Sequence, residues 1–191
     1  MATALTRPAF VSGAQPRWAT LDDWGTLVPE RLRPWLAEPG LLTARVREAS
    51  GGRVELKLLG VRAVPMLAEW REALRIEDRG CHLREIEFAD ASRGRRWVFA
   101  QTVFPVSTLA AHPWLAELGG AGLGATLAGR DDVEREPLRH ARLLGDEPLL
   151  ADAGLADDEP PGEPLWARRA VYRIAGHPLL VQELFLPGLG R

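Results

Sequence analysis

The chain has 191 residues, of which 24 are lysine or arginine and 26 are aspartate or glutamate, so its formal charge is −2. This length fits one domain that can bury a real hydrophobic core. The small charge argues against a protein that grips nucleic acid or an anionic membrane through a basic surface. We therefore expect a single domain over residues 1–191 that is a monomer. We expect it neither to bind nucleic acid nor to span a membrane.

Cysteine usage and the N-terminus indicate the compartment. The chain has one cysteine, Cys81, so it cannot form an internal disulfide, which suits a reducing cytosol. Residues 1–15 lack the long apolar core of a secretory signal. No run of 18 or more apolar residues is present that would cross a bilayer. These features predict a soluble, cytoplasmic protein in which Cys81 is a small buried hydrophobe.

The first third of the chain carries weak helix signals. Pro29 is typical of the first turn of a helix, and Pro34 marks a second start. The tryptophans of this region are expected to anchor the core; they are Trp18, Trp24 and Trp35.

A strand is expected next. Residues 50–52 read Ser-Gly-Gly and predict a hairpin or a helix-to-strand turn. Residues 54–58 alternate apolar with charged side chains, as a half-exposed strand does. Over residues 63–80 the periodicity does not decide between a short helix and a strand.

Arg84 is the first candidate functional residue. Alternate side chains of a strand over residues 82–88 fall on opposite faces, so Arg84 shares a face with Ile86 and Phe88. If that face is buried, the guanidinium needs an anionic partner, because an unpaired buried charge costs several kcal/mol. Arg84 is therefore a candidate anion receptor. The alternatives are a structural ion pair or an arginine that points outward.

A hairpin is expected to follow that strand. Residues 89–94 are rich in turn formers, and residues 97–103 are aromatic and β-branched. Pro105 then ends the second strand, because proline cannot donate to the ladder.

A helix is expected after the hairpin. Ser107 or Thr108 can cap it, and it runs through residues 112–115 toward Gly119. Residues 119–125, Gly-Gly-Ala-Gly-Leu-Gly-Ala, formally satisfy a loose dinucleotide fingerprint. That motif requires a preceding strand within a βαβ unit, whereas a helix is expected here, so we interpret the segment as a helix C-cap and a loop.

Two polar segments follow. Residues 131–144 are heavily charged and include Glu134, Arg135 and Glu136, which we assign to the solvated face of a strand or helix. Residues 145–164 are rich in proline, glycine and acidic residues and predict a loop, either an insertion or a mobile cover.

Glu183 is the second candidate functional residue. Residues 171–174 and 179–186 predict two strands joined by a hairpin turn. On the second strand Glu183 shares a face with Val181 and Phe185. A carboxylate in an apolar row is desolvated, which raises its pKa unless a cation compensates.

Metal and nucleophile signatures are absent from the sequence. The four histidines are scattered, without the spacing of a zinc site, and there is no Gly-x-Ser-x-Gly elbow or P-loop. Neither a metal nor a catalytic triad is expected.

Two separated blocks of motifs resemble a known family. The first block is Leu-Arg-Glu-Ile at residues 83–86 with Gln-Thr-Val-Phe-Pro-Val-Ser-Thr-Leu at 101–109, and the second is Leu-Trp-Ala-Arg-Arg at 165–169, Gly-His-Pro-Leu-Leu at 176–180 and Glu-Leu-Phe-Leu-Pro at 183–187. In this order they resemble the chorismate pyruvate-lyase (chorismate lyase) family. The resemblance covers residues 70–188 well and the first 65 residues poorly.

The expected fold is α+β. We expect a single antiparallel β-sheet built largely from strands around residues 53–62, 81–103 and 171–186, with helices covering one side over an enclosed ligand pocket. The resemblance also implies a strand within residues 63–80.

The resemblance implies a lyase that converts chorismate into 4-hydroxybenzoate and pyruvate, the first step of the bacterial ubiquinone ring pathway, without a cofactor. It implies that Arg84 and Glu183 bind the two ends of the product and serve catalysis. Leu123 would line the pocket, and so would Leu42, near whose position the best-known member of the family has a methionine. The hydrogen transfer is either pericyclic or acid-catalysed by Glu183. The other function classes are a non-catalytic effector-binding domain of the same fold and a structural domain with an internal Arg84–Glu183 ion pair.

Overall fold

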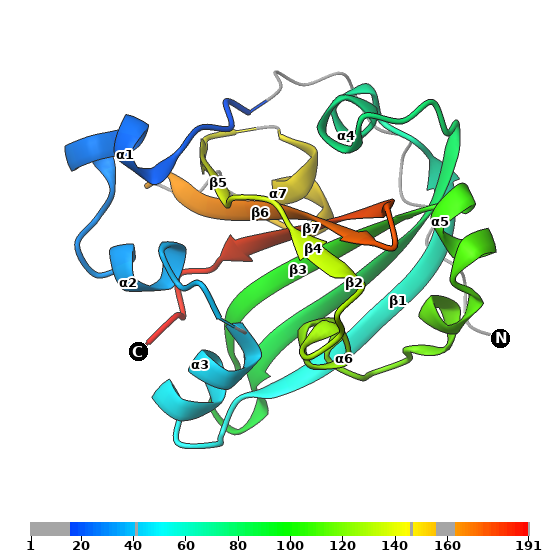
Figure 1. The fold of residues 1–191 in the computed structure, drawn as a ribbon. Coiled ribbons are helices and arrows are strands. Elements are labelled where there is room, and N and C mark those ends of the chain that lie inside the picture. Colours follow the sequence, from blue (N-terminus) through cyan, green and yellow to red (C-terminus); the bar gives the residue numbers. More distant parts are fainter. Residues whose placement is uncertain (1–15, 41, 146, 156–162, 191) are drawn as a thin grey trace, which may run out of the picture.

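The protein is built around one antiparallel sheet (Figure 1). The computed structural model describes residues 16–40, 42–145, 147–155 and 163–190. Within these residues seven strands run in the order β1-β2-β3-β7-β6-β4, and β5 also pairs with β6. The expected α+β fold with a single antiparallel sheet is confirmed. The strands are β1 (Glu55–Pro65), β2 (Gly80–Asp90), β3 (Arg95–Pro105), β4 (Val133–Arg135), β5 (Arg139–Leu143), β6 (Leu165–Ile174) and β7 (His177–Phe185).

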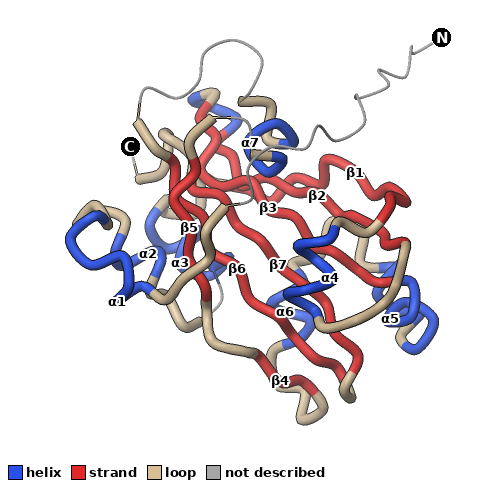
Figure 2. The backbone as a smooth tube through the Cα atoms, turned by 90° about the horizontal axis from the view of Figure 1, so that it is seen from above, coloured by secondary structure: helices blue, strands red, loops and turns tan. Residues whose placement is uncertain are grey.

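Helices pack on both faces of this sheet (Figures 1 and 2). α2, α3 and α6 lie on one face and are the helices expected over a pocket, whereas α4 and α7 add cover on the other face. The helices are α1 (Leu21–Trp24), α2 (Arg33–Leu36), α3 (Leu42–Ala49), α4 (Ala68–Leu74), α5 (Val106–Ala111), α6 (Leu123–Leu127) and α7 (Pro148–Asp152). Short 3₁₀ turns are η1 (Gly25–Leu27), η2 (Ala91–Arg93) and η3 (Pro113–Glu117).

The hairpins follow the turn chemistry of the sequence. Asp90 caps the β2–β3 turn by accepting from the backbone N–H of Arg93, and Gly94 takes the left-handed conformation that closes it. Ala175 and Gly176 join β6 to β7 with φ of 46° and 84°, which is the two-residue turn that matches the twist of paired strands. Both expected hairpins are confirmed.

The core is divided between the two faces of the sheet. On the pocket face, buried side chains of α2 and α3 pack against β2 and β3; they include Leu36, Val46, Phe88 and Val98. On the other face, Trp70 and Leu74 of α4 pack near Cys81 and Leu83. Cys81 is 1% exposed, and burial raises the pKa of its thiol to about 11. It is therefore the buried hydrophobe that was expected.

The strand expected within residues 63–80 is largely wrong. β1 ends at Pro65, which lacks the N–H needed to extend the ladder, and α4 follows. Trp70 and Leu74 stand one helical turn apart and are both buried, so the segment gains more from a helix that covers the sheet than from an added strand.

The helix expected from Ser107 toward Gly119 is interrupted. α5 ends at Ala111, because His112 precedes a proline and adopts φ −131° and ψ 70°. Neither expected cap forms. The Thr108 hydroxyl instead donates to the carbonyl of Pro178, at 2.6 Å, and the Ser107 N–H donates to Asp78.

Two further expectations change. The helix expected at Pro29 does not form, although α2 does contain Pro34 in its first turn. The loop expected over residues 145–164 contains α7, because Leu149 and Leu150 are buried against the sheet; residues 156–162 lie outside the described part.

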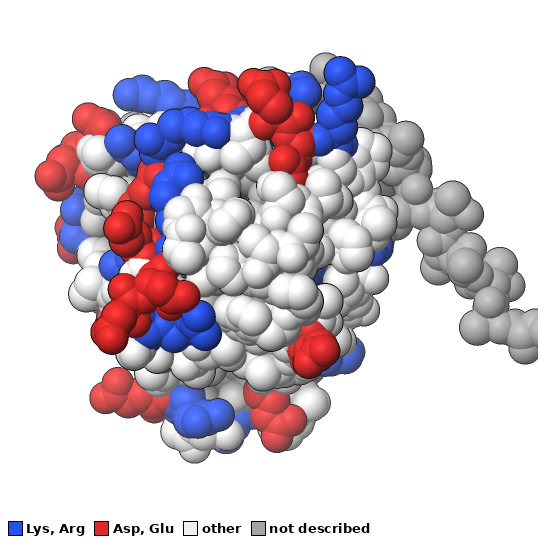
Figure 3. Space-filling model, turned by 45° about the vertical axis from the view of Figure 1, so that its right-hand side comes forward, with Lys and Arg blue, Asp and Glu red and all other residues white. Residues whose placement is uncertain are grey.

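The surface carries charges of both signs. On the face in Figure 3 blue and red side chains are interspersed around a broad uncharged area. None of the described helices is both long enough and apolar enough to cross a membrane.

His140 of β5 should make the stability depend on pH. Burial lowers the pKa of its imidazole; Nε2 lies 3.0 Å from the carbonyl of Leu36, and Nδ1 has no hydrogen-bond partner among the described residues. The unfolded chain therefore takes up a proton at a pH where the folded chain does not. Unfolding free energy should fall as the pH drops below about 6.5, by at most about 1.4 kcal/mol per pH unit. Denaturant unfolding from pH 7 to 5 tests this, and an unchanged slope in His140→Gln would contradict it.

Candidate functional site

A cavity lies between the pocket face of the sheet and the helices α3 and α6. Side chains from β2, β3, β7 and β6 form its floor, and the starts of α3 and α6 form its roof. Most of the lining is apolar. The charged residues in the lining are Arg84, Arg135, Arg168 and Glu183.

All four residues named from the sequence line this cavity. Arg84 stands on β2 and Glu183 on β7, with β3 between them. Leu42 begins α3 and Leu123 begins α6, and the two side chains are 4% and 7% exposed. The fold therefore brings together residues that are up to 141 positions apart, 42 to 183. Their functions remain predictions.

Arg84 is buried without an acidic partner. It is 2% exposed, and burial lowers the pKa of its guanidinium. Its Nε and Nη2 donate to the carbonyl of Gly119 at 3.2 and 3.0 Å, and Nη2 also donates to that of Ala121 at 2.7 Å. No carboxylate of a described residue pairs with Arg84, and its Nη1 makes no hydrogen bond within the described part of the chain. The two alternatives, an ion pair and an outward arginine, are therefore wrong.

The loop that receives Arg84 depends on a glycine. Gly119 has φ +49°, a conformation that L side chains rarely adopt. This conformation belongs to the turn that offers the carbonyls of Gly119 and Ala121 to the guanidinium, directly before α6. The glycine-rich segment thus orients an arginine. It does not precede a phosphate-binding helix of a βαβ unit.

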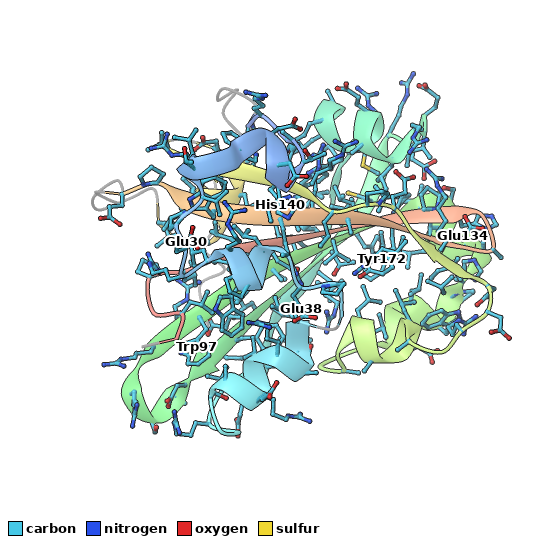
Figure 4. All side chains as sticks on the ribbon, turned by 60° about the vertical axis from the view of Figure 1, so that its left-hand side comes forward. Glu30, Glu38, Trp97, Glu134, His140 and Tyr172 are labelled. Carbon is cyan, nitrogen blue, oxygen red and sulfur yellow. The ribbon has the colours of Figure 1, made fainter. Side chains whose placement is uncertain are left out.

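Glu183 does have a compensating cation, Arg168 of β6. Arg168 Nε donates to Glu183 Oε2 at 2.5 Å, and its side chain is 3% exposed against 16% for Glu183. Arg168 Nη1 also donates to the carbonyls of Trp35 at 3.0 Å and Glu38 at 2.8 Å. Figure 4 shows Glu38 on the pocket side of the sheet, next to α3. The internal Arg84–Glu183 pair is therefore wrong, and Arg168 joins Glu183 to the segment that leads into α3.

Arg135 and Tyr172 also belong to the polar lining. They face each other across β4 and β6, and Figure 4 shows Tyr172 on the same side of the sheet as α6. Burial and the charge of Glu183 raise the pKa of the Tyr172 hydroxyl, while a hydrogen bond with Arg135 opposes that rise. The sequence interpretation, which assigned Arg135 to a solvated face, missed its place in the cavity.

The site suits a small ring with negative charge. Apolar side chains such as Ile86 and Phe88, which are 8% and 3% exposed, can cover the faces of a ring, and the arginines can bind its anionic substituents. Among the described residues no group of three or more His, Cys, Asp or Glu side chains is placed to hold a metal ion.

Fold and cavity together define an α+β domain with a cationic pocket for a small anion. Comparison with known proteins identifies the family. The model of the chorismate lyase family matches residues 14–189, and the chain belongs to this family. The chorismate pyruvate-lyase of Pectobacterium atrosepticum is 30% identical over 163 residues, which cover 85% of this chain and 80% of that protein. A protein of Azoarcus sp. (strain BH72) named "Probable chorismate pyruvate-lyase" is 36% identical over 166 residues, 83% of this chain and 85% of that protein.

Solved structures confirm the fold alone. A transcriptional regulator of the GntR family from Bacillus cereus superposes with a TM-score of 0.52 at 13% identity, over 71% of this chain and 92% of that one. The C-terminal domain of PhnF gives a TM-score of 0.51 at 16% identity, over 74% of this chain and 88% of that one.

Proposed function

We propose that this protein is a chorismate pyruvate-lyase, which converts chorismate into 4-hydroxybenzoate and pyruvate at the start of the ubiquinone ring pathway. The observation that carries the proposal is the charge of the cavity. Three arginines and one glutamate line it, and 3 − 1 leaves a net charge of +2. Chorismate is a compact dianion, so the charges match. The protein acts in the cytoplasm as a single-domain monomer and needs no cofactor.

Each predicted residue has a role in this proposal. Arg84 binds the ring carboxylate through Nη1, which the carbonyls of the loop leave available. Glu183 accepts a hydrogen bond from the ring hydroxyl of the substrate, and Leu42 and Leu123 contact the ring. The same contacts bind the two ends of 4-hydroxybenzoate.

The reaction needs little more from the protein than that it hold chorismate in the reactive conformation. The ring hydrogen on the carbon that bears the hydroxyl passes to the enolpyruvyl methylene. The bond from the ring to the ether oxygen breaks, that oxygen becomes the keto oxygen of pyruvate, and the ring becomes aromatic. Positioning of this kind can lower the activation barrier by roughly 7–11 kcal/mol in ideal cases.

The Arg168 contact favours this route over acid catalysis. Arg168 Nε donates to Glu183 Oε2 at 2.5 Å, so Glu183 is held in place as a hydrogen-bond acceptor. Glu183 therefore orients the substrate hydroxyl in the proposed mechanism.

The test is incubation of the purified protein with chorismate, with pyruvate and 4-hydroxybenzoate followed together. We expect both products in a 1:1 ratio. Binding of 4-hydroxybenzoate without turnover of chorismate would contradict the proposal and favour an effector-binding domain.

Glu183→Gln is expected to lower turnover only about 10-fold, or about 1.4 kcal/mol of barrier, because the amide still accepts a hydrogen bond and no external proton is needed. The measurement is the pH–rate profile with stability and 4-hydroxybenzoate affinity determined in parallel, because the change also removes the anion that Arg168 pairs with. A loss beyond roughly 10³-fold at parental stability and affinity, with a pH limb that disappears, would establish Glu183 as a general acid.

A further inference from the structure

One group of the proposed substrate still lacks a partner, the carboxylate of its enolpyruvyl side chain. Arg84 is assigned to the ring carboxylate, and Arg168 is held by Glu183 and two carbonyls. Arg135 is the remaining arginine of the lining. No carboxylate of the described residues forms an ion pair with it.

The acidic neighbours of Arg135 do not neutralise it. Glu136 pairs with Arg75 at 2.6 Å and with Arg173 at 3.1 Å, so its carboxylate is engaged by two other arginines. Glu134 is the middle residue of β4, so its side chain and that of Arg135 point to opposite faces of the sheet, and Figure 4 shows Glu134 near the edge of the molecule. The charge of Arg135 is thus available to a ligand in the cavity.

Arg135 and Arg84 face the cavity from opposite sides. Arg84 is on β2 and Arg135 on β4, with β3, β7 and β6 between them. Four strand spacings separate their backbones by about 19 Å in a flat sheet, at about 4.8 Å each. Two long side chains reach inward over this span, with Glu183 on the floor between them. A ring with one carboxylate attached directly and a second carboxylate on a side chain fits such a pair of cations, whereas the aromatic product has one carboxylate and uses one of them.

We propose that Arg135, aided by the Tyr172 hydroxyl, binds the enolpyruvyl carboxylate and so sets the preference for chorismate over 4-hydroxybenzoate. This inference rests on the proposed function. Arg135 is an exposed residue at the edge strand, so it lies where the side chain that leaves as pyruvate can depart to solvent.

The test compares Arg135→Gln, Arg135→Lys and the control Arg139→Gln. Arg139 is an exposed arginine of the neighbouring β5 that does not line the cavity, so its loss changes the net charge equally. We measure kcat and KM for chorismate and the Kd of 4-hydroxybenzoate for each variant. Arg135→Gln should lower kcat/KM about 10-fold or more through KM, with the Kd of 4-hydroxybenzoate within about 2-fold of the parent. Arg135→Lys should recover part of the loss, and Arg139→Gln should match the parent.

Two results would overturn the inference. One is an Arg135→Gln variant with parental kcat/KM. The other is a variant whose affinity for 4-hydroxybenzoate falls as much as its kcat/KM, because then Arg135 does not distinguish the substrate by its second carboxylate. Failure of the proposed function looks different, since in that case the parent itself releases no pyruvate from chorismate.

Discussion

Replacing Arg168 by methionine should lower the free energy of unfolding by about 3–5 kcal/mol, the usual cost of removing one partner of a buried ion pair. Arg168 is 3% exposed and serves three acceptors, namely Glu183 and the carbonyls of Trp35 and Glu38. Methionine fills a similar volume but leaves the carboxylate and both carbonyls without their donor. Urea unfolding with linear extrapolation measures the change.

A second variant separates the contribution of the Arg168–Glu183 ion pair to stability from the contribution of side-chain packing. Arg168→Met combined with Glu183→Leu removes both charges, and apolar replacement of a whole buried pair is often neutral. The double variant should therefore regain the part of the lost stability that comes from the unpaired carboxylate, while the carbonyls of Trp35 and Glu38 still lack their donor. A single variant within about 1 kcal/mol of the parent would show that the contact contributes little, as exposed ion pairs do.

The strands that carry the site could be predicted from alternation alone. Arg84 among Ile86 and Phe88, and Glu183 between Val181 and Phe185, are charged side chains on faces that must be buried if their neighbours are. The turn residues predicted both hairpins, and the hairpins in turn predicted the pairing of β2 with β3 and of β6 with β7. Local patterns thus suffice where a face is defined within one strand.

Contacts between distant segments were beyond the same reasoning. Arg168 also alternates with Ala170 and Tyr172 on the pocket face, so the alternation that marks Arg84 and Glu183 marks Arg168 as well. Its pairing with Glu183 follows from the register of β6 against β7. Arg135 gave no such signal, because β4 has only three residues and its neighbours are charged. Whether the side chain of Arg135 faces solvent or a cavity depends on the position of α6, which covers the cavity. The periodicity of the sequence does not predict that position.

Arg84→Ala should weaken 4-hydroxybenzoate binding by about 2–5 kcal/mol, the range found when one partner of a desolvated charge pair is removed. By the affinity scale this is roughly a 30- to 4,000-fold rise in Kd. The physical reason is that Arg84 is buried and has no acidic partner among the described residues, so a bound carboxylate would supply the charge it lacks. Titration calorimetry on parent and variant measures the change, with Arg139→Ala as the control for loss of an arginine outside the cavity.

Arg84 also supports the fold, so the binding measurement needs a second variant at this position. Its guanidinium holds the carbonyls of Gly119 and Ala121, and alanine would release the turn that leads into α6 and Leu123. Arg84→Lys keeps the positive charge but has no planar fork to serve the loop and a carboxylate together. It should bind 4-hydroxybenzoate more tightly than Arg84→Ala and less tightly than the parent. Parental affinity in a folded Arg84→Ala variant would mean that the carboxylate is bound elsewhere, and the assignment of Arg84 as the anion receptor would be wrong.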